Sequence, residues 1–297
     1  MPNFTLPDTV FCQAAEQYAT PFHLYDERGI RQTARALRRA FAAVGEYQEY
    51  FAVKALPTPA ILRLLKEEGC GVDCASYTEL RLAEAVGFAG RDIMFSANVV
   101  PPEEFAYARR LGAYINLDDI THIDELAANG GIPEELCLRF NPGGTFRVGN
   151  AIMGDPGDAK YGMTRAQLSQ ALQALKGYGA KRFGLHAFLS SNTTDPSYYP
   201  ALARLLFETG RELIAETGLT LDFVNLSGGI GIPYRPNEPV ADLPAIGEGV
   251  RVAYDEVFTK NGIEGVAIKT ELGRYMTGPN GWLVTHVTHE KNIHKHY

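Results

Sequence analysis

Short apolar runs alternate with amphipathic segments along almost the whole chain, and this alternation constrains the fold more than any other feature. The apolar runs resemble strands, and nearly all of them are separated by segments with helical periodicity. Such alternation predicts parallel strands joined by helical crossovers. The eight predicted strands are residues 49–54, 72–75, 93–97, 113–117, 136–141, 182–189, 221–227 and 266–272.

Eight strand–helix units within roughly 250 residues is the size of a (β/α)8 barrel, which is the fold that we expect. A doubly wound open sheet is the alternative, but no G-x-G-x-x-G motif follows the first strand. Two further stretches, FHLYD at 22–26 and GWLVTHVTHE at 281–290, alternate like strands and lie outside these units. We expect them to belong to another sheet, and a strand at 281–290 without a partner would expose its edges.

The bulk composition argues against several classes of function. The 297 residues carry a net charge of −7, and their Lys and Arg residues are scattered, which is unlike a nucleic-acid-binding surface. The N-terminus lacks the charged and apolar regions of a leader, and no apolar run is long enough to span a membrane. We therefore expect a cytoplasmic protein that binds neither nucleic acid nor membrane.

Cysteines and histidines give no metal pattern. The four cysteines are few and mostly far apart, so we expect buried thiols and no disulfide framework. Four histidines (His286, His289, His294 and His296) crowd a lysine-containing tail, which solvation explains at least as well as metal binding. No metal site is predicted.

Active sites of barrels lie at the C-terminal ends of the strands, and this rule selects residues without any family knowledge. The first strand would end in Lys54, the second at Asp73 and the fifth at Arg139. The end of the sixth strand presents a further set, which is His186, Phe188 and Ser191. A lone lysine at a strand end is ordinarily a solvent-exposed residue, so Lys54 needs partners to carry chemistry.

Two glycine-containing loops supply such partners. SGGIG (227–231) follows the seventh strand, and glycines allow backbone N–H groups to close on an anion such as phosphate. ELGRY (271–275) follows the eighth strand and adds a carboxylate and a guanidinium. Alone, the first loop is as readily a tight turn and the second a surface ion pair. On consecutive strand ends, where barrels favour phosphate, they predict a phosphate site.

A phosphate site and a lysine at one barrel mouth suggest pyridoxal 5′-phosphate, an aldehyde that binds lysine as a Schiff base. This cofactor is an electron sink, and its pyridine nitrogen needs an acidic partner. Glu271 is the residue predicted to pair with that nitrogen.

The chain resembles the pyridoxal-phosphate decarboxylases of the alanine-racemase fold, and most of all diaminopimelate decarboxylase. The matching stretches are EYFAVKAL, GVDCASYTEL, INLDD, LRFNPG, VNLSGGIGIPY and ELGRYMTGP. They appear in the family's order over about residues 20–290. GIPY favours the diaminopimelate branch over the ornithine or arginine decarboxylases.

The resemblance implies a role for each matching residue. Lys54 would bind the cofactor, with Asp73 and Arg139 beside it, and His186 would match the first histidine of the strand-six motif. Phosphate contacts would come from Gly228, Gly229 and Gly273, helped by Ser191 and Arg274. Lys54, His186 and Glu271 would be the catalytic residues.

Four departures from the family pattern indicate a divergent subfamily, and one of them is Ser190 in place of the glycine of the strand-six motif. Phe188 stands where the family has a second histidine that stacks on the cofactor ring, so that position can stack but cannot titrate. Ser227 replaces the first glycine of the phosphate loop, and Ala55-Leu56-Pro57 follows Lys54 where many relatives have Ala-Asn.

The implied reaction is loss of the α-carboxylate of an amino acid, with meso-diaminopimelate giving L-lysine as the first expectation. A decarboxylase of another basic or polyamine-related amino acid, or a non-catalytic cofactor-binding homologue, is the alternative. The resemblance also implies three segments: 1–26 on the β-domain side, 27–278 as the barrel, and 279–297 as the start of a truncated C-terminal β-domain. We expect a homodimer in the full-length form, and low activity for this chain alone.

Overall fold

The eight central strands close into a parallel barrel in the computed structural model, which describes residues 6–150, 152, 155, 157–235 and 237–296. Each strand pairs with the next, and β2 pairs with β9 to close the ring, with Glu49 opposite Thr270. The barrel strands are β2 (Tyr47–Ala52), β3 (Gly71–Cys74), β4 (Ile93–Phe95), β5 (Tyr114–Leu117), β6 (Glu135–Arg139), β7 (Arg182–His186), β8 (Thr220–Asn225) and β9 (Ala267–Thr270). The closed ring confirms the predicted (β/α)8 barrel and excludes the open sheet.

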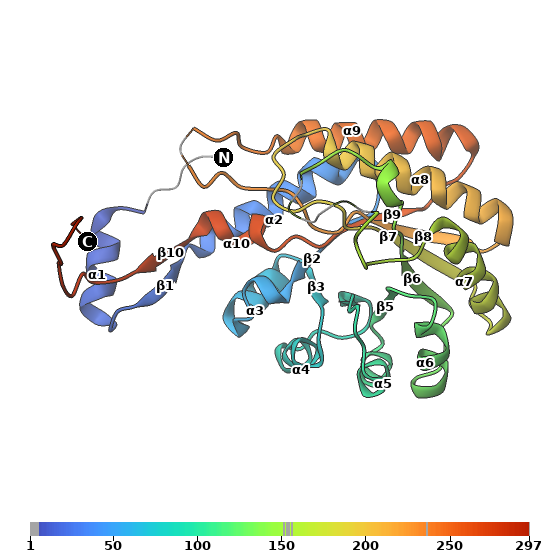
Figure 1. Ribbon diagram of the computed structural model, residues 1–297, viewed down its shortest axis with the longest axis horizontal. Coiled ribbons are helices and arrows are strands. Elements are labelled where there is room, and N and C mark those ends of the chain that lie inside the picture. The colour runs from blue at the N-terminus through green and yellow to red at the C-terminus, as the bar shows by residue number, and fades with distance from the viewer. Residues whose placement is uncertain (1–5, 151, 153–154, 156, 236, 297) are drawn as a thin grey trace.

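Helices surround the barrel on its outside (Figure 1). Apolar residues at helical spacing form the buried faces of these helices. In α2, for example, the buried residues include Ile30, Ala34, Leu37 and Phe41. The surrounding helices are α2 (Glu27–Phe41), α3 (Pro59–Glu67), α4 (Tyr77–Val86), α5 (Pro102–Leu111), α6 (His122–Asn129), α7 (Arg165–Gly177), α8 (Tyr198–Thr217) and α9 (Leu243–Val257). A short helix, α10 (Arg274–Thr277), follows β9.

The interior of the barrel has two layers of different character. The lower layer is an apolar cluster that gathers side chains from six strands: Tyr50, Met94, Tyr114, Cys137, Phe223 and Ala267. Because side chains alternate between the two faces of a strand, the residue two positions further on points inward again. These next inward residues are polar on four strands: Ser96, Asn116, Arg139 and Asn225. On β9 the residue two positions after Ala267 is Lys269, which points into the floor, and Glu271 is the following inward residue. The barrel therefore has a packed floor and a polar upper layer at its C-terminal end.

The two stretches outside the barrel pair with each other. β1 (Phe22–Tyr25) and β10 (Gly281–Val284) form a two-stranded antiparallel sheet with Phe22 opposite Val284. The prediction of a strand over 281–290 is wrong after Val284, because β1 offers only four residues as a partner. The expectation that both stretches belong to a sheet other than the barrel is confirmed.

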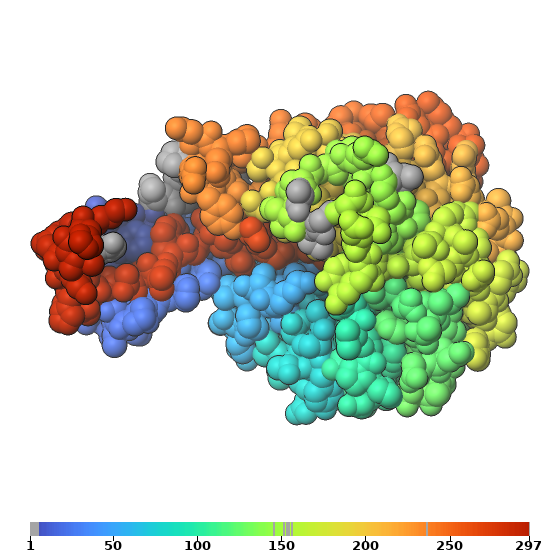
Figure 2. Space-filling view, in the orientation of Figure 1, coloured from blue at the N-terminus to red at the C-terminus, as the bar shows by residue number. Residues whose placement is uncertain are grey.

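This sheet and the helix α1 (Asp8–Gln17) extend away from the barrel (Figure 1). The space-filling view shows the extension as a narrow arm beside the wide barrel (Figure 2). Helix α1 was not predicted, and it holds Cys12, which is exposed, whereas Cys70, Cys74 and Cys137 are buried as expected. Cys12 escapes burial because α1 buries none of its residues.

Within the described residues, no helix is both long and apolar enough to cross a membrane.

Candidate functional site

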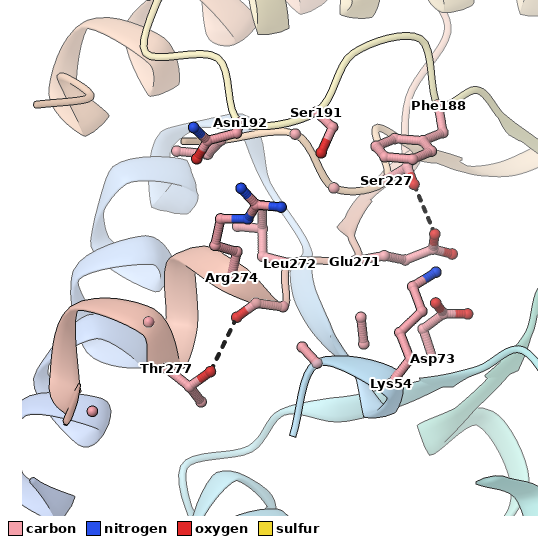
Figure 3. Close-up of a pocket in the computed structure, with 18 of the residues that line it drawn as sticks. Lys54, Asp73, Phe188, Ser191, Asn192, Ser227, Glu271, Leu272, Arg274 and Thr277 are labelled. Atoms are coloured by element: carbon pink, nitrogen blue, oxygen red, sulfur yellow. Dashed lines mark hydrogen bonds between the residues drawn. The ribbon is translucent and has the colours of Figure 1, made fainter. Parts of the chain in front are cut away.

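All eleven residues predicted for the site line one cavity of about 660 Å³ at the C-terminal end of the barrel. They come from six different strand ends and lie far apart in the chain. The set is Lys54, Asp73, Arg139, His186, Phe188, Ser191, Gly228, Gly229, Glu271, Gly273 and Arg274. Figure 3 shows the side chains of Lys54, Asp73 and Glu271 converging on the cavity.

Lys54 does not lie on the strand that was predicted to present it. β2 ends at Ala52, and Lys54 occupies a short 3-10 turn, η2 (Val53–Ala55). The turn lifts the side chain out of the barrel wall, so that it is exposed in the cavity with its amine directed toward Glu271 (Figure 3). An amine in this position is free to react with a ligand.

Glu271 is buried, and each of its two carboxylate oxygens has two polar partners. Asn225 Nδ2 and Ser96 Oγ donate to its Oε1 at 2.7 and 3.2 Å. Ser227 Oγ donates to Oε2 at 2.8 Å, and His186 Nε2 lies 3.1 Å from the same oxygen. Burial opposes ionisation, but the electrostatic effect of His186 and these hydrogen bonds outweigh it and lower the pKa of the carboxyl to about 2. The cavity therefore contains a fixed carboxylate.

The pKa of Asp73 is shifted in the opposite direction to that of Glu271. Burial, followed by repulsion from Glu271, raises the pKa of Asp73 well above its usual range, and Lys54 offsets part of the effect. Its Oδ1 is buried without a partner among the described residues, as is Nδ1 of His186. Orphaned polar atoms at a cavity wall are a feature of sites that a ligand completes.

The glycine loops bring backbone close to backbone at the cavity wall. A Cβ on Gly228 would lie 2.8 Å from the carbonyl oxygen of Glu271, and one on Gly229 would lie 2.9 Å from that of Ser190. Gly229 also has a φ of 126°, which side chains rarely adopt. Within the described chain, neither glycine N–H has a hydrogen-bond acceptor. These free donors suit an anion.

The two predicted arginines differ in how they are held. Arg139 forms an ion pair with Asp118 at 3.0 Å and lies over the ring of Tyr161, with its guanidinium carbon 4.7 Å from the ring centre. Arg274 is exposed and donates to Tyr234 Oη at 2.8 Å. Arg139 is thus fixed, whereas Arg274 lies at the open side of the cavity.

Ser191 and Phe188 lie in the loop that follows β7. Phe188 is half-buried, and its flat ring lies beside Ser227 at the wall of the cavity (Figure 3). The backbone carbonyl of Ser191 accepts from Asn150 Nδ2 at 2.7 Å, which ties this loop to the one after β6.

Several residues that line the cavity or hold its side chains in place were missed from the sequence. Ser96 and Asn225 hold Glu271, and Asn116 Nδ2 donates to Ser96 Oγ at 3.2 Å. The two-residue alternation beyond the apolar floor would have found all three, because they are the next inward positions on their strands. The β1–β10 sheet also contributes His23, Tyr25, Trp282 and Leu283 to the wall, and no strand-end rule points to them.

The residues present fit pyridoxal 5′-phosphate. A reactive amine, a buried carboxylate, unpaired polar atoms and a glycine loop with free N–H groups line the same cavity. A phosphorylated aromatic aldehyde with a ring nitrogen requires such a set.

Comparison with known proteins places the chain in a family. The family described as "Pyridoxal-dependent decarboxylase, pyridoxal binding domain" matches residues 28–278. Protein TabA of Pseudomonas amygdali pv. tabaci is 38% identical over 91% of this chain and 62% of its own length. Diaminopimelate decarboxylase of Actinosynnema pretiosum subsp. auranticum is 31% identical over 81% of this chain and 54% of its own length. The chain thus spans between half and two thirds of these relatives.

Solved structures share the fold. Diaminopimelate decarboxylase from Helicobacter pylori, complexed with L-lysine, superposes with a TM-score of 0.85 at 24% identity, covering 96% of this chain and 71% of that one. Lysine decarboxylase from Selenomonas ruminantium gives 0.84 at 25% identity, covering 98% and 72%. The sequence match over residues 28–278 includes the strand ends that form the cavity, and the chain belongs to the pyridoxal-dependent decarboxylase family, of which it contains the pyridoxal-binding domain.

Proposed function

We propose that this barrel binds pyridoxal 5′-phosphate and belongs to an enzyme that removes the α-carboxylate of an amino acid as CO2. The observation that carries the proposal is the convergence of Lys54, Glu271 and the Gly228-Gly229 loop on one cavity. When bound, the cofactor is the electron sink for the pair of electrons that the departing carboxylate leaves behind.

Each side chain has a task that follows from its surroundings. The Lys54 amine would hold the aldehyde carbon covalently with loss of water, and the free N–H groups of the glycine loop would hold the phosphate. Glu271, held as a carboxylate, would keep a proton at the ring nitrogen and so strengthen the electron sink that the cofactor supplies. Phe188 offers a flat apolar surface to the cofactor ring.

We further propose meso-diaminopimelate as the substrate and L-lysine as the product. Relatives named diaminopimelate decarboxylase support this choice, among them the one that is 31% identical. A relative named L-glutamyl-[BtrI acyl-carrier protein] decarboxylase, 27% identical over 93% of this chain, supports a second candidate, an amino acid attached to an acyl-carrier protein. The other basic amino acids remain alternatives within the same chemistry.

Titration of the purified chain with pyridoxal 5′-phosphate tests the cofactor site. We expect a visible absorbance band that resists dialysis and that is lost in Lys54→Ala, because only an amine in the cavity forms the covalent bond. Lys181→Ala is the matched control, since Lys181 is an exposed lysine paired with Glu134 away from the cavity. A band that persists in Lys54→Ala, or never appears in the wild type, contradicts the proposal.

Labelled CO2 release from the loaded chain then identifies the substrate. We expect release from carboxyl-labelled meso-diaminopimelate to exceed that from lysine, ornithine, arginine or a glutamyl-acyl-carrier protein. A preference for any other member of this panel replaces the proposed substrate and leaves the cofactor site intact. Low rates are expected of this chain alone, so the comparison is of relative rates within the panel. No CO2 from any member, by a chain that holds the cofactor through Lys54, rejects the proposed activity for this chain and leaves the cofactor site intact.

A further inference from the structure

Ser227 has a backbone conformation that is unfavourable for any residue with a side chain. Its φ is 55°, in the left-handed region that glycine occupies freely, and the residue is buried. Two glycines follow it, so glycine at this position would continue the loop without strain. A side chain retained against this penalty calls for a contact that glycine cannot make.

Every polar group of Ser227 is engaged. Its N–H donates to Asn225 Oδ1 at 2.8 Å, and its carbonyl accepts from Tyr199 Oη and from the N–H of Glu271, both at 2.9 Å. The hydroxyl donates to Glu271 Oε2 at 2.8 Å. Backbone and side chain of Ser227 thus both bind Glu271.

Asn225 completes the arrangement from the same strand end. Its amide donates to Glu271 Oε1 at 2.7 Å while its carbonyl oxygen holds the N–H of Ser227. Residues 225–227 therefore donate hydrogen bonds to both oxygens of the Glu271 carboxylate. Gly228 and Gly229 follow this segment directly. The placement of the carboxylate and the placement of the glycine loop depend on the same residues.

We propose that Ser227 is a positioning residue: with its backbone held by Asn225, its hydroxyl fixes the Glu271 carboxylate as the partner of the cofactor's ring nitrogen. The inference rests on the proposed function, because it assigns to Ser227 a task that only a bound pyridine ring would reveal. It explains why a strained serine stands where the conformation favours glycine.

Two probes separate this role from general support of the cavity. Pyridoxal 5′-phosphate and its 1-deaza analogue share the aldehyde and the phosphate, but in the analogue a C–H group replaces the ring nitrogen. The ratio of their dissociation constants isolates what the partner of the nitrogen contributes. We expect Ser227→Ala to reduce the preference for the nitrogen-containing ring by about tenfold, since one hydrogen bond to a charged group is lost. A merely structural role would weaken both probes equally.

Two further variants sharpen the result. Ser227→Gly relieves the left-handed backbone, so we expect a higher melting temperature than for Ser227→Ala with the same loss of preference. Ser197→Ala is the matched control, because the Ser197 hydroxyl also donates to a carboxylate, Asp195 Oδ1 at 2.7 Å, but at an exposed position. It should leave the preference unchanged.

The possible outcomes distinguish this inference from the proposed function. If the wild type prefers the nitrogen-containing ring and both Ser227 variants keep that preference, the role of Ser227 is rejected and the proposed function stands. If the wild type binds both probes equally, the pairing of Glu271 with the ring nitrogen is wrong, and the role of Ser227 falls with it. If it binds neither probe, the cofactor site itself is rejected.

Discussion

Glu271 owes its state to its immediate neighbours rather than to exposure. A fully buried carboxyl would ordinarily hold its proton, because burial penalises charge. Donors from Ser96, Asn225 and Ser227, together with His186, reverse this preference. At the scale of single residues, the site is therefore organised by hydrogen-bond donors around the two carboxylate oxygens of Glu271. Substitution of Glu271 should for that reason cost the folded chain much of its stability.

Glu271→Gln should destabilise the folded chain in a pH-dependent way. The folded-state pKa is lowered from 4.5 to about 2, so ionisation of Glu271 contributes stability above pH 4.5 that is lost as pH falls toward 2. We expect a deficit of about 3 kcal/mol in the free energy of unfolding at pH 7, shrinking as the pH is lowered through this window. Urea unfolding between pH 2 and 7 measures it.

Glu248→Gln is the control for that series, since Glu248 is an exposed carboxylate paired with Arg251 and should change stability little. A difference between wild type and Glu271→Gln that stays constant over the pH range would contradict the account of the lowered pKa.

At the scale of elements, the strand ends decide which residues meet, and the exact ends were the hardest feature to predict. The strand assigned to 49–54 ends at Ala52, and the strand assigned to 136–141 ends at Arg139. Strand 182–189 ends at His186, which leaves Phe188 and Ser191 in a loop. Apolar composition continues past each of these strand ends, whereas the backbone hydrogen bonds depend on where the neighbouring strand stops.

The contact between helices α2 and α9 is set by a single glycine. A Cβ on Gly247 would lie 2.0 Å from the carbonyl oxygen of Ala40, a backbone atom that cannot rotate away. We expect Gly247→Ala to lower the free energy of unfolding by about 1–3 kcal/mol, because it overpacks this crossing. Thermal or urea unfolding measures the change.

Gly177→Ala, at the end of α7, provides the contrast. Nothing lies within 4 Å of its added Cβ, so alanine should raise stability by about 0.5–1 kcal/mol through helix propensity. If the two substitutions had equal effects, the close approach of α2 and α9 would not constrain the fold.

At the scale of the whole molecule, the barrel floor contains a buried lysine, Lys269. Lys269 points into the apolar layer, where its Nζ lies 4.0 Å from the ring centre of Tyr114 and 4.3 Å from that of Phe223. It donates to Tyr50 Oη at 3.0 Å. Rings from three different strands meet there only because the barrel is closed. Burial lowers the pKa of Lys269 to about 8 from its ordinary 10.5.

Lys269→Met should therefore stabilise the protein at neutral pH. Between pH 10.5 and 8 only the unfolded chain takes up the proton, so wild-type stability falls as the pH is lowered through that window. We expect the variant to be more stable than the wild type by about 1–3 kcal/mol at pH 7. The gain is limited because the aromatic rings around Lys269 compensate part of the cost of burying its charge. Urea unfolding from pH 7 to 11 should show the gain disappearing. A less stable variant at pH 7 would mean that the floor favours the charged lysine.

The sequence alone determined the class of fold and the main members of the site, because both follow from local pattern. Period and composition identify strands and helices, their alternation implies a parallel barrel, and a barrel presents its strand ends at one mouth. Lys54, the SGGIG loop and Glu271 could therefore be selected from their positions in the chain.

The tertiary structure decided how these residues are held. It alone shows that Ser96 and Asn225 donate to Glu271, that Ser227 lies in the left-handed region, and that β1 pairs with β10. The physical reason is that hydrogen-bond geometry, burial and the resulting shifts in pKa depend on atoms brought together from distant parts of the chain. Period and composition do not encode those distances, and only the closed barrel determines them.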